Sequence, residues 1–160
     1  AGDIKLSKAT IAWPATESLF ANAEQEVGRF AIKANNDTVV LRDFNLDNNW
    51  GTLTDDDFLA LFDGNLTLFK IDADNETEVS ANITFNDSTK NFEVRNMNVE
   101  IAKDKTVNFK LMANLGNIKD YYGSGVLFNI TANSVRATSS VEDLTNSSAQ
   151  DLSKLHIHLR

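Results

Sequence analysis

The sequence predicts an all-β protein built as an antiparallel β-sandwich. Apolar and polar residues alternate with the two-residue period of half-buried strands along most of the chain, whereas helical periodicity is nearly absent. Clusters of Asn, Asp and Gly interrupt this alternation about every 8 to 12 residues, a spacing typical of short antiparallel strands joined by turns. Because the chain has 160 residues and is 42% hydrophobic, we expect one domain with one core over residues 1–160.

Each predicted strand is a short alternating segment bounded by turn residues. In chain order, the predicted strands are Ile4–Leu6, Phe30–Ile32, Val40–Leu46, Ala81–Phe85, Phe92–Val94, Val99–Ile101, Val107–Leu111, Val126–Val135 and Lys154–Leu159. The intervening turn clusters include Asn35–Asp37, Asp72–Asn75 and Asn114–Gly125.

Residues 54–64 fit two local structures. Thr54 followed by Asp55–Asp57 could cap a helix, because acidic side chains stabilise the positive end of the helix dipole. Alternatively, Asp63 and Gly64 between two apolar runs indicate a type I′ hairpin turn. We favour the hairpin. We also expect a short helix at 17–26 and a polar loop over 140–153, so the fold has one or two helical turns.

Charge and hydropathy exclude two kinds of partner. The net charge is -8, the pI is about 4.7 and the basic residues are scattered, whereas nucleic-acid binding needs clustered positive charge. No apolar run reaches the roughly 18 residues that span a bilayer. The chain starts at Ala1 without a leader, which fits a secreted protein whose signal peptide has been removed. We therefore expect an extracellular protein that neither binds nucleic acid nor inserts into membranes.

Seven tripeptides have the N-x-S/T pattern of N-glycosylation acceptors. Their asparagines are Asn36, Asn65, Asn75, Asn82, Asn86, Asn129 and Asn146. Strand alternation places Asn82 and Asn129 on the polar side of their strands, and turn clusters hold most of the others. An Asn-rich solvent-facing surface would produce the same pattern without any sugar. Both interpretations predict a surface rich in amide and hydroxyl groups.

Catalytic and metal-binding signals are weak. His156 and His158 share one face of the last strand but have no third ligand in the sequence, and no nucleophile or phosphate-binding motif is present. Asp72, Asp74 and Glu76 alternate as oxygen ligands for a structural calcium would, yet solvated acidic turns look the same. We expect no enzyme activity and no cofactor, with structural calcium as the alternative.

Three aromatic residues in predicted loops could form a platform for carbohydrate. These candidates are Trp50, Tyr121 and Tyr122. They support an alternative function, a monomeric carbohydrate-binding or adhesin module.

Three stretches of the chain resemble a known family. They are residues 30–44 (FAIKANNDTVVLRDF), residues 61–64 (LFDG) and residues 99–115 (VEIAKDKTVNFKLMANL). Their pattern is similar to the immunoglobulin-like β-sandwich domains of prokaryotic cell-surface proteins of the adhesin, S-layer or fibre type. The resemblance covers roughly residues 26–138. It implies an immunoglobulin-like sandwich, with a jelly roll as the variant, and a structural or adhesive role without catalytic residues.

The two chain ends lie outside this resemblance and are predicted to be strands. A terminal strand can pair in its own sheet or add to the open edge of a neighbouring subunit. Repeated head-to-tail addition builds a filament. Residues 3–12 and 154–159 are the candidate donor strands. The sequence therefore favours a glycosylated subunit of a cell-surface filament that binds copies of itself.

Overall fold

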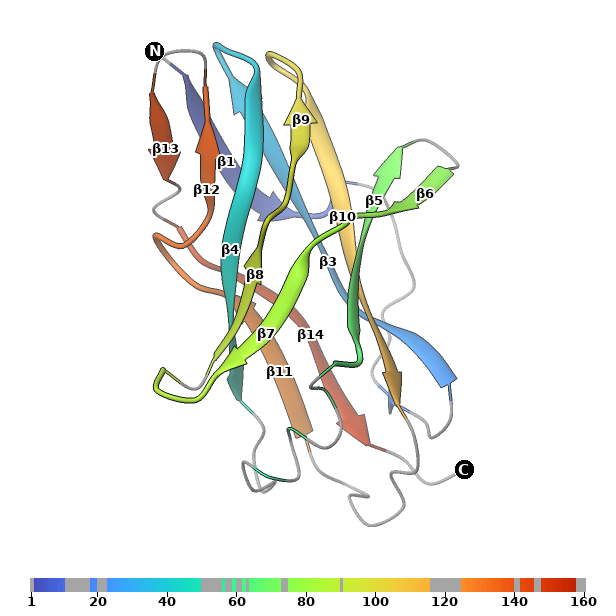
Figure 1. The fold of residues 1–160 in the computed structure, drawn as a ribbon. Coiled ribbons are helices and arrows are strands. Elements are labelled where there is room, and N and C mark those ends of the chain that lie inside the picture. Colours follow the sequence, from blue (N-terminus) through green and yellow to red (C-terminus); the bar gives the residue numbers. More distant parts are fainter. Residues whose placement is uncertain are drawn as a thin grey trace.

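The structure, a computed structural model, is an all-β sandwich of two sheets packed face to face (Figure 1). It describes residues 2–10, 18–19, 23–49, 56, 59, 62, 64–72, 75–89, 91–115, 125–139, 142–145 and 148–157. The predicted all-β sandwich is therefore confirmed.

The first sheet has five strands. In spatial order they are β1 (Asp3–Lys8), β3 (Ala23–Asn35), β10 (Thr106–Leu115), β5 (Leu66–Asp72) and β6 (Asn75–Glu78). Every neighbouring pair in this sheet is antiparallel.

The second sheet is organised around one long strand, β4 (Val39–Asn49), which pairs with two shorter strands on each side. One side holds β12 (Arg136–Thr138) with β13 (Asp143–Thr145), and β11 (Gly125–Ile130) with β14 (Gln150–Ile157) and β2 (Ser18–Leu19). The other side holds β9 (Val99–Ile101) and β8 (Asn91–Arg95), followed by β7 (Asn82–Asn86). Among the described strand pairs of this sheet, only β14 and β2 run parallel.

Aromatic rings join the two sheets in one core. Phe30 and Phe109 of the first sheet stack at 5.2 Å between ring centroids, and Phe44 of β4 meets Phe30 edge-on at 5.4 Å. These geometries are the favoured ones for aromatic pairs. All described buried apolar residues except Ala31 form a single cluster that draws on both sheets. Strand alternation explains it, because each strand contributes every second side chain to the same interior.

A β-bulge in β4 changes which residues face this core. Leu41 pairs with Ala137 and Asp43 pairs with Arg136, so Arg42 is an extra residue in β4. Leu41 before the bulge and Phe44 after it are both fully buried. Without the extra residue, the alternation that starts at Leu41 would point Asp43 into the core instead of Phe44.

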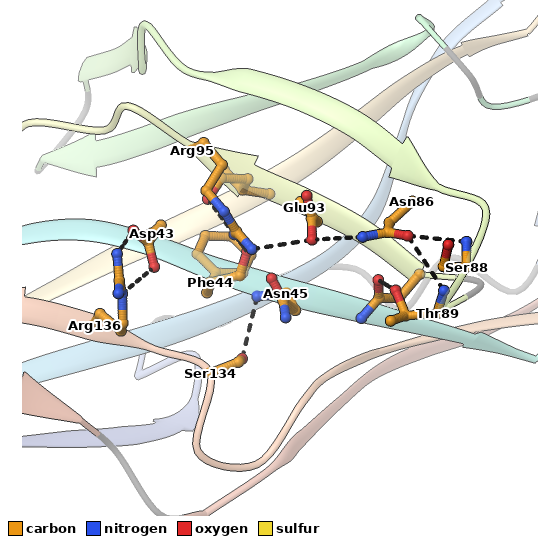
Figure 2. Close-up of polar contacts among 12 residues, drawn as sticks. Asp43, Phe44, Asn45, Asn86, Ser88, Thr89, Glu93, Arg95, Ser134 and Arg136 are labelled. Carbon is orange, nitrogen blue, oxygen red and sulfur yellow. Dashed lines mark hydrogen bonds and ion pairs between the residues drawn. The ribbon is translucent and has the colours of Figure 1, made fainter.

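The bulge places Asp43 on the outer face of β4, where it meets Arg136 (Figure 2). The Arg136 Nε and Nη2 atoms donate to the two carboxylate oxygens of Asp43 at 2.8 and 2.6 Å. This hydrogen bonding and the negative charge of Asp43 raise the pKa of Arg136 above its ordinary value. The two-pronged contact therefore ties β12 to the bulge.

The preference for a hairpin over 54–64 was wrong, because Asp56, Leu59 and Phe62 have helical conformation. Residues three apart lie on one side of a helix, and Phe62 is fully buried with its ring 5.3 Å from that of Phe128. Gly64 then adopts a left-handed φ of 78°, and the Asn65 amide donates to the Phe62 carbonyl. The glycine ends a helical turn here, a role that demands the same backbone conformation as a hairpin turn.

Three other local predictions also need correction. In place of a helix at 17–26, the described part contains β2 and the start of β3, because β10 pairs with that segment from Ala23 onward, with one bulge at Val27. The predicted strand 126–135 ends at Ile130, and a turn follows in which Asn133 has positive φ. Within the predicted loop 140–153, β13 pairs with β12, and β14 starts at Gln150 against β11.

We predict that Arg136→Ala lowers the free energy of unfolding by about 1–2 kcal/mol. Asp43 is only 7% exposed, and a buried charge that loses its hydrogen-bond partner keeps its desolvation penalty. The lower part of the usual range applies because the Arg136 side chain is 65% exposed and solvent screens its charge. Urea unfolding measures the difference.

Asp43→Asn combined with Arg136→Ala removes the unpaired charge and should recover part of the loss. A double variant no more stable than Arg136→Ala alone would contradict this explanation.

Candidate functional site

The N-terminal strand β1 is held at one edge of the first sheet. Six consecutive residues pair with β3, from Asp3 opposite Asn35 to Lys8 opposite Phe30. Ile4 and Leu6 point into the core at 3% and 5% exposure, whereas Lys5 is exposed. The strand is therefore bound by main-chain hydrogen bonds and two aliphatic side chains.

A polar contact anchors the chain just after β1. The Thr10 amide donates to Asn108 Oδ1 at 2.9 Å, and Asn108 Nδ2 donates back to Thr10 Oγ1 at 2.9 Å. Asn108 lies in β10 at 7% exposure. Because these two residues are 98 positions apart, nothing in their local sequence indicated the contact.

The C-terminal strand β14 also pairs within its own chain. It lies antiparallel to β11 and parallel to β2. Of the two candidate donor segments, 3–12 and 154–159, the described parts are thus docked in the sheets of this chain.

The candidate glycosylation sites differ in exposure. Asn36 in the turn between β3 and β4, Asn75 in β6 and Asn82 in β7 are exposed, although Asn75 was expected in a turn and instead opens a strand. Asn65 and Asn129 are half-buried. Asn146 lies outside the described residues. The three exposed asparagines are therefore the best placed to carry glycans.

Asn86 differs from these three because its side chain is used inside the protein (Figure 2). Its Nδ2 atom donates to Glu93 Oε2 at 3.1 Å, and its Oδ1 atom accepts from the amides of Ser88 and Thr89 at 2.9 and 3.2 Å. Such contacts close an Asx turn between β7 and β8. A glycan on Nδ2 would compete with the bond to Glu93.

The calcium candidates do not converge in the described part of the chain. Asp72 pairs with Asn75 and Glu76 pairs with Ile71, so Asp72 and Glu76 point to opposite faces of the hairpin. Glu76 also accepts from Lys110 Nζ at 2.5 Å. Asp74 lies outside the described residues, and among those described no three His, Cys, Asp or Glu residues gather as a metal site would require.

The carbohydrate-binding candidates Trp50, Tyr121 and Tyr122 lie outside the described residues, as does His158. Six of the described phenylalanines are fully buried in the core. Phe69 is half-buried on β5, where Lys110 Nζ sits 5.6 Å from its ring centroid. Phe69 is therefore covered by a cation on its own sheet.

A pocket of about 270 Å³ lies beside the bulge and is lined by residues that include Arg42, Arg136, Asp143 and Leu144. The guanidinium groups of Arg42 and Arg136, which line this pocket, donate to acceptors within the protein. Arg136 binds Asp43, and Arg42 donates to Thr138 Oγ1 and Asn98 Oδ1, both at 3.3 Å. These contacts brace the bulge, and the pocket beside it is lined by residues of β4, β12 and β13. No described helix has the length and apolar character needed to cross a membrane.

We predict that Asn86→Ala lowers the free energy of unfolding by about 1–2 kcal/mol, because it removes the hydrogen bonds that close the Asx turn. Asn75→Ala is the matched control: it also removes a sequon but changes an exposed side chain, so we expect a change within about 0.5 kcal/mol. Both are measured by urea unfolding of protein from a host that adds no N-linked glycans. Equal losses in the two variants would contradict the assigned role of Asn86.

No protein-family model and no curated protein matches this chain. Among solved structures, one described as AvmM, which catalyses macrocyclization in alchivemycin A biosynthesis, is 12% identical with a TM-score of 0.44. The match covers 99% of this chain and 88% of that one. A family 123 glycoside hydrolase from Clostridium perfringens, studied for glycolipid glycan hydrolysis, is 8% identical with a TM-score of 0.46. The match covers 99% of this chain but only 27% of the hydrolase.

Proposed function

We propose that this protein is a non-catalytic, extracellular structural protein: a glycosylated subunit of a cell-surface filament that assembles by head-to-tail addition of β-strands. The observation that carries the proposal is the docking of β1. It is the first strand of this sequence and lies at a sheet edge, held by a six-residue ladder and by two buried side chains, Ile4 and Leu6. Main-chain hydrogen bonds of this kind are as readily made by a strand from another copy.

The anchoring of Thr10 to Asn108 supports this role. A donor strand inserted into a neighbour needs a fixed register, because a shift of one residue would turn its apolar side chains to solvent. The reciprocal hydrogen bonds between Thr10 and Asn108 fix the chain just beyond the strand. A donor segment that includes residues 3–10 therefore contains Thr10, the residue that fixes its register.

The distribution of polar groups supports an extracellular, glycosylated surface. Asn36, Asn75 and Asn82 present exposed sequons on a turn and on strands of both sheets. Glycans there would project from the sandwich without entering its core. An occupied sequon requires an acceptor amide that the enzyme can reach, and these three supply it.

A pair of cysteines can detect strand exchange, because the chain has no cysteine of its own. Lys5 and Lys33 face each other across β1 and β3, within the distance that a disulfide bridges. We predict that oxidised Lys5→Cys/Lys33→Cys protein gives a ladder of covalent multimers on a non-reducing gel, since each β1 pairs with β3 of another copy.

The control is Lys70→Cys/Thr77→Cys, which joins opposite residues of the β5–β6 hairpin. It should form its disulfide within one chain and run as a monomer. If both variants ran as monomers, β1 would belong to its own chain and the filament proposal would be wrong.

Negative-stain electron microscopy of native, unheated material should show fibres whose repeat is one domain length. Deletion of residues 1–12 should abolish them, because the donor strand is then missing. Dispersed domain-sized particles over a wide concentration range would contradict the proposal.

A further inference from the structure

The edge strands of the two sheets differ in charge. Natural proteins protect edge strands with charged residues or keep them very short, because an open edge invites pairing with another chain. β1 carries Asp3, Lys5 and Lys8, the four-residue β6 carries Glu76 and Glu78, and the three-residue β13 carries Asp143. β7, with the sequence NITFN, has no charged residue and pairs with β8 alone among the described strands. It is the one described edge of five or more residues without this protection.

The inner side of β7 is incompletely covered. Ile83 and Phe85 pack against the core but remain half-buried, with the Phe85 ring 5.3 Å from that of Phe92. Ile83, Leu66 and Leu68 also line a cavity of about 130 Å³ beside this edge. A strand added next to β7 would bring its inward side chains beside Ile83 and Phe85 and bury them further.

Charge favours a second copy of this chain at this edge. The chain as a whole has a net charge of -8, so two copies carry like net charge. The hairpin of β7 and β8 is different: Asp87 and Glu93 balance Lys90 and Arg95 in its sequence, and Arg95 lies 3.3 Å from Glu93. Two copies can therefore approach through this hairpin without like-charge repulsion.

The strand is also complementary to itself. Its pattern of Asn, apolar, Thr, apolar and Asn reads the same in both directions about Thr84. Two antiparallel copies centred on Thr84 place Thr84 opposite Thr84, Ile83 opposite Phe85 and Asn82 opposite Asn86. Thr–Thr pairs and aromatic–β-branched pairs across strands are stabilising. All apolar side chains then stay on the core side and all polar ones on the outer side.

We infer that β7 binds β7 of a second copy, antiparallel and about a two-fold axis at Thr84, so that the second sheets of two copies become continuous. This contact does not use β1 and stands apart from the proposed strand exchange. The contact joins only two copies, because each copy has one β7 edge and that edge is used up in the pair. In a filament it would join two filaments side by side, and without filaments it would give a dimer.

Thr84→Cys tests the axis directly, because the two cysteines would face each other at the distance of opposite residues in a sheet. In protein from a host without N-glycosylation, we expect oxidation to convert most of this variant to disulfide-linked dimer. Asn82→Cys is the matched control on the same strand. Asn82 is exposed, and in the proposed pair the Asn82 residues of the two copies lie four residues, about 13 Å, apart along the strand, so little dimer should form. Thr77→Cys provides a second control on the β6 edge, and it likewise removes a sequon.

Equal cross-linking of Thr84→Cys and Asn82→Cys would reflect random collision and would overturn the inference, as would monomeric Thr84→Cys protein. Thr84→Lys supplies an independent measurement, since it places two positive charges face to face. We expect Thr84→Lys protein to lack the β7-paired species when size exclusion is followed by light scattering. When Thr84→Lys is combined with Lys5→Cys/Lys33→Cys, the covalent ladder should be retained. Retention of the paired species in Thr84→Lys protein would overturn the inference. Absence of the ladder from Lys5→Cys/Lys33→Cys protein that keeps Thr84 would contradict only the strand exchange.

Discussion

Burial of the apolar faces of two sheets against each other is the constraint on which the rest of this structure depends. Phe30, Phe44 and Phe109 bring rings from both sheets into one contact, and the surrounding aliphatic residues complete a single core. Truncating such a phenylalanine typically costs about 3–5 kcal/mol, a large part of the stability of a domain. Since this core fixes which face of each strand is inward, it also fixes which residues are free to serve the surface.

The β4 bulge shows how the chain reconciles this constraint with its polar residues. β4 pairs with strands on both sides and cannot simply end where its alternation fails. One extra residue, Arg42, restores the inward phase for Phe44 and moves Asp43 outward to Arg136. The Asp43 carboxylate is then satisfied by a charged partner, as a nearly buried carboxylate must be.

The outer parts of the fold are where function is expected, because the interior contains a packed core. Two edge strands of the sandwich differ in their place along the chain: β1 is its first strand and pairs with β3, whereas β7 lies in the middle of the sequence and pairs with β8. In the proposed assembly, filaments grow through β1 and pair through β7. The exposed sequons at Asn36, Asn75 and Asn82 lie in the turn between β3 and β4, in β6 and in β7.

Sequence periodicity alone determined the fold class, because a two-residue period requires one buried face per strand, and most predicted strands from Ile4–Leu6 to Val107–Leu111 were found. The same alternation predicted strands near both ends of the sequence, and the N-x-S/T pattern identified the candidate sequons. Tertiary structure decided the rest. Gly64 fits a hairpin or a helix end equally well, and the burial of Phe62 against Phe128 selected the helix. Likewise, residues 23–26 and 143–145 became strands because neighbouring strands offered them hydrogen-bond partners. Asn108 and Thr10, or Asp43 and Arg136, meet only after about a hundred residues of chain have folded between them, so no local pattern could reveal those contacts.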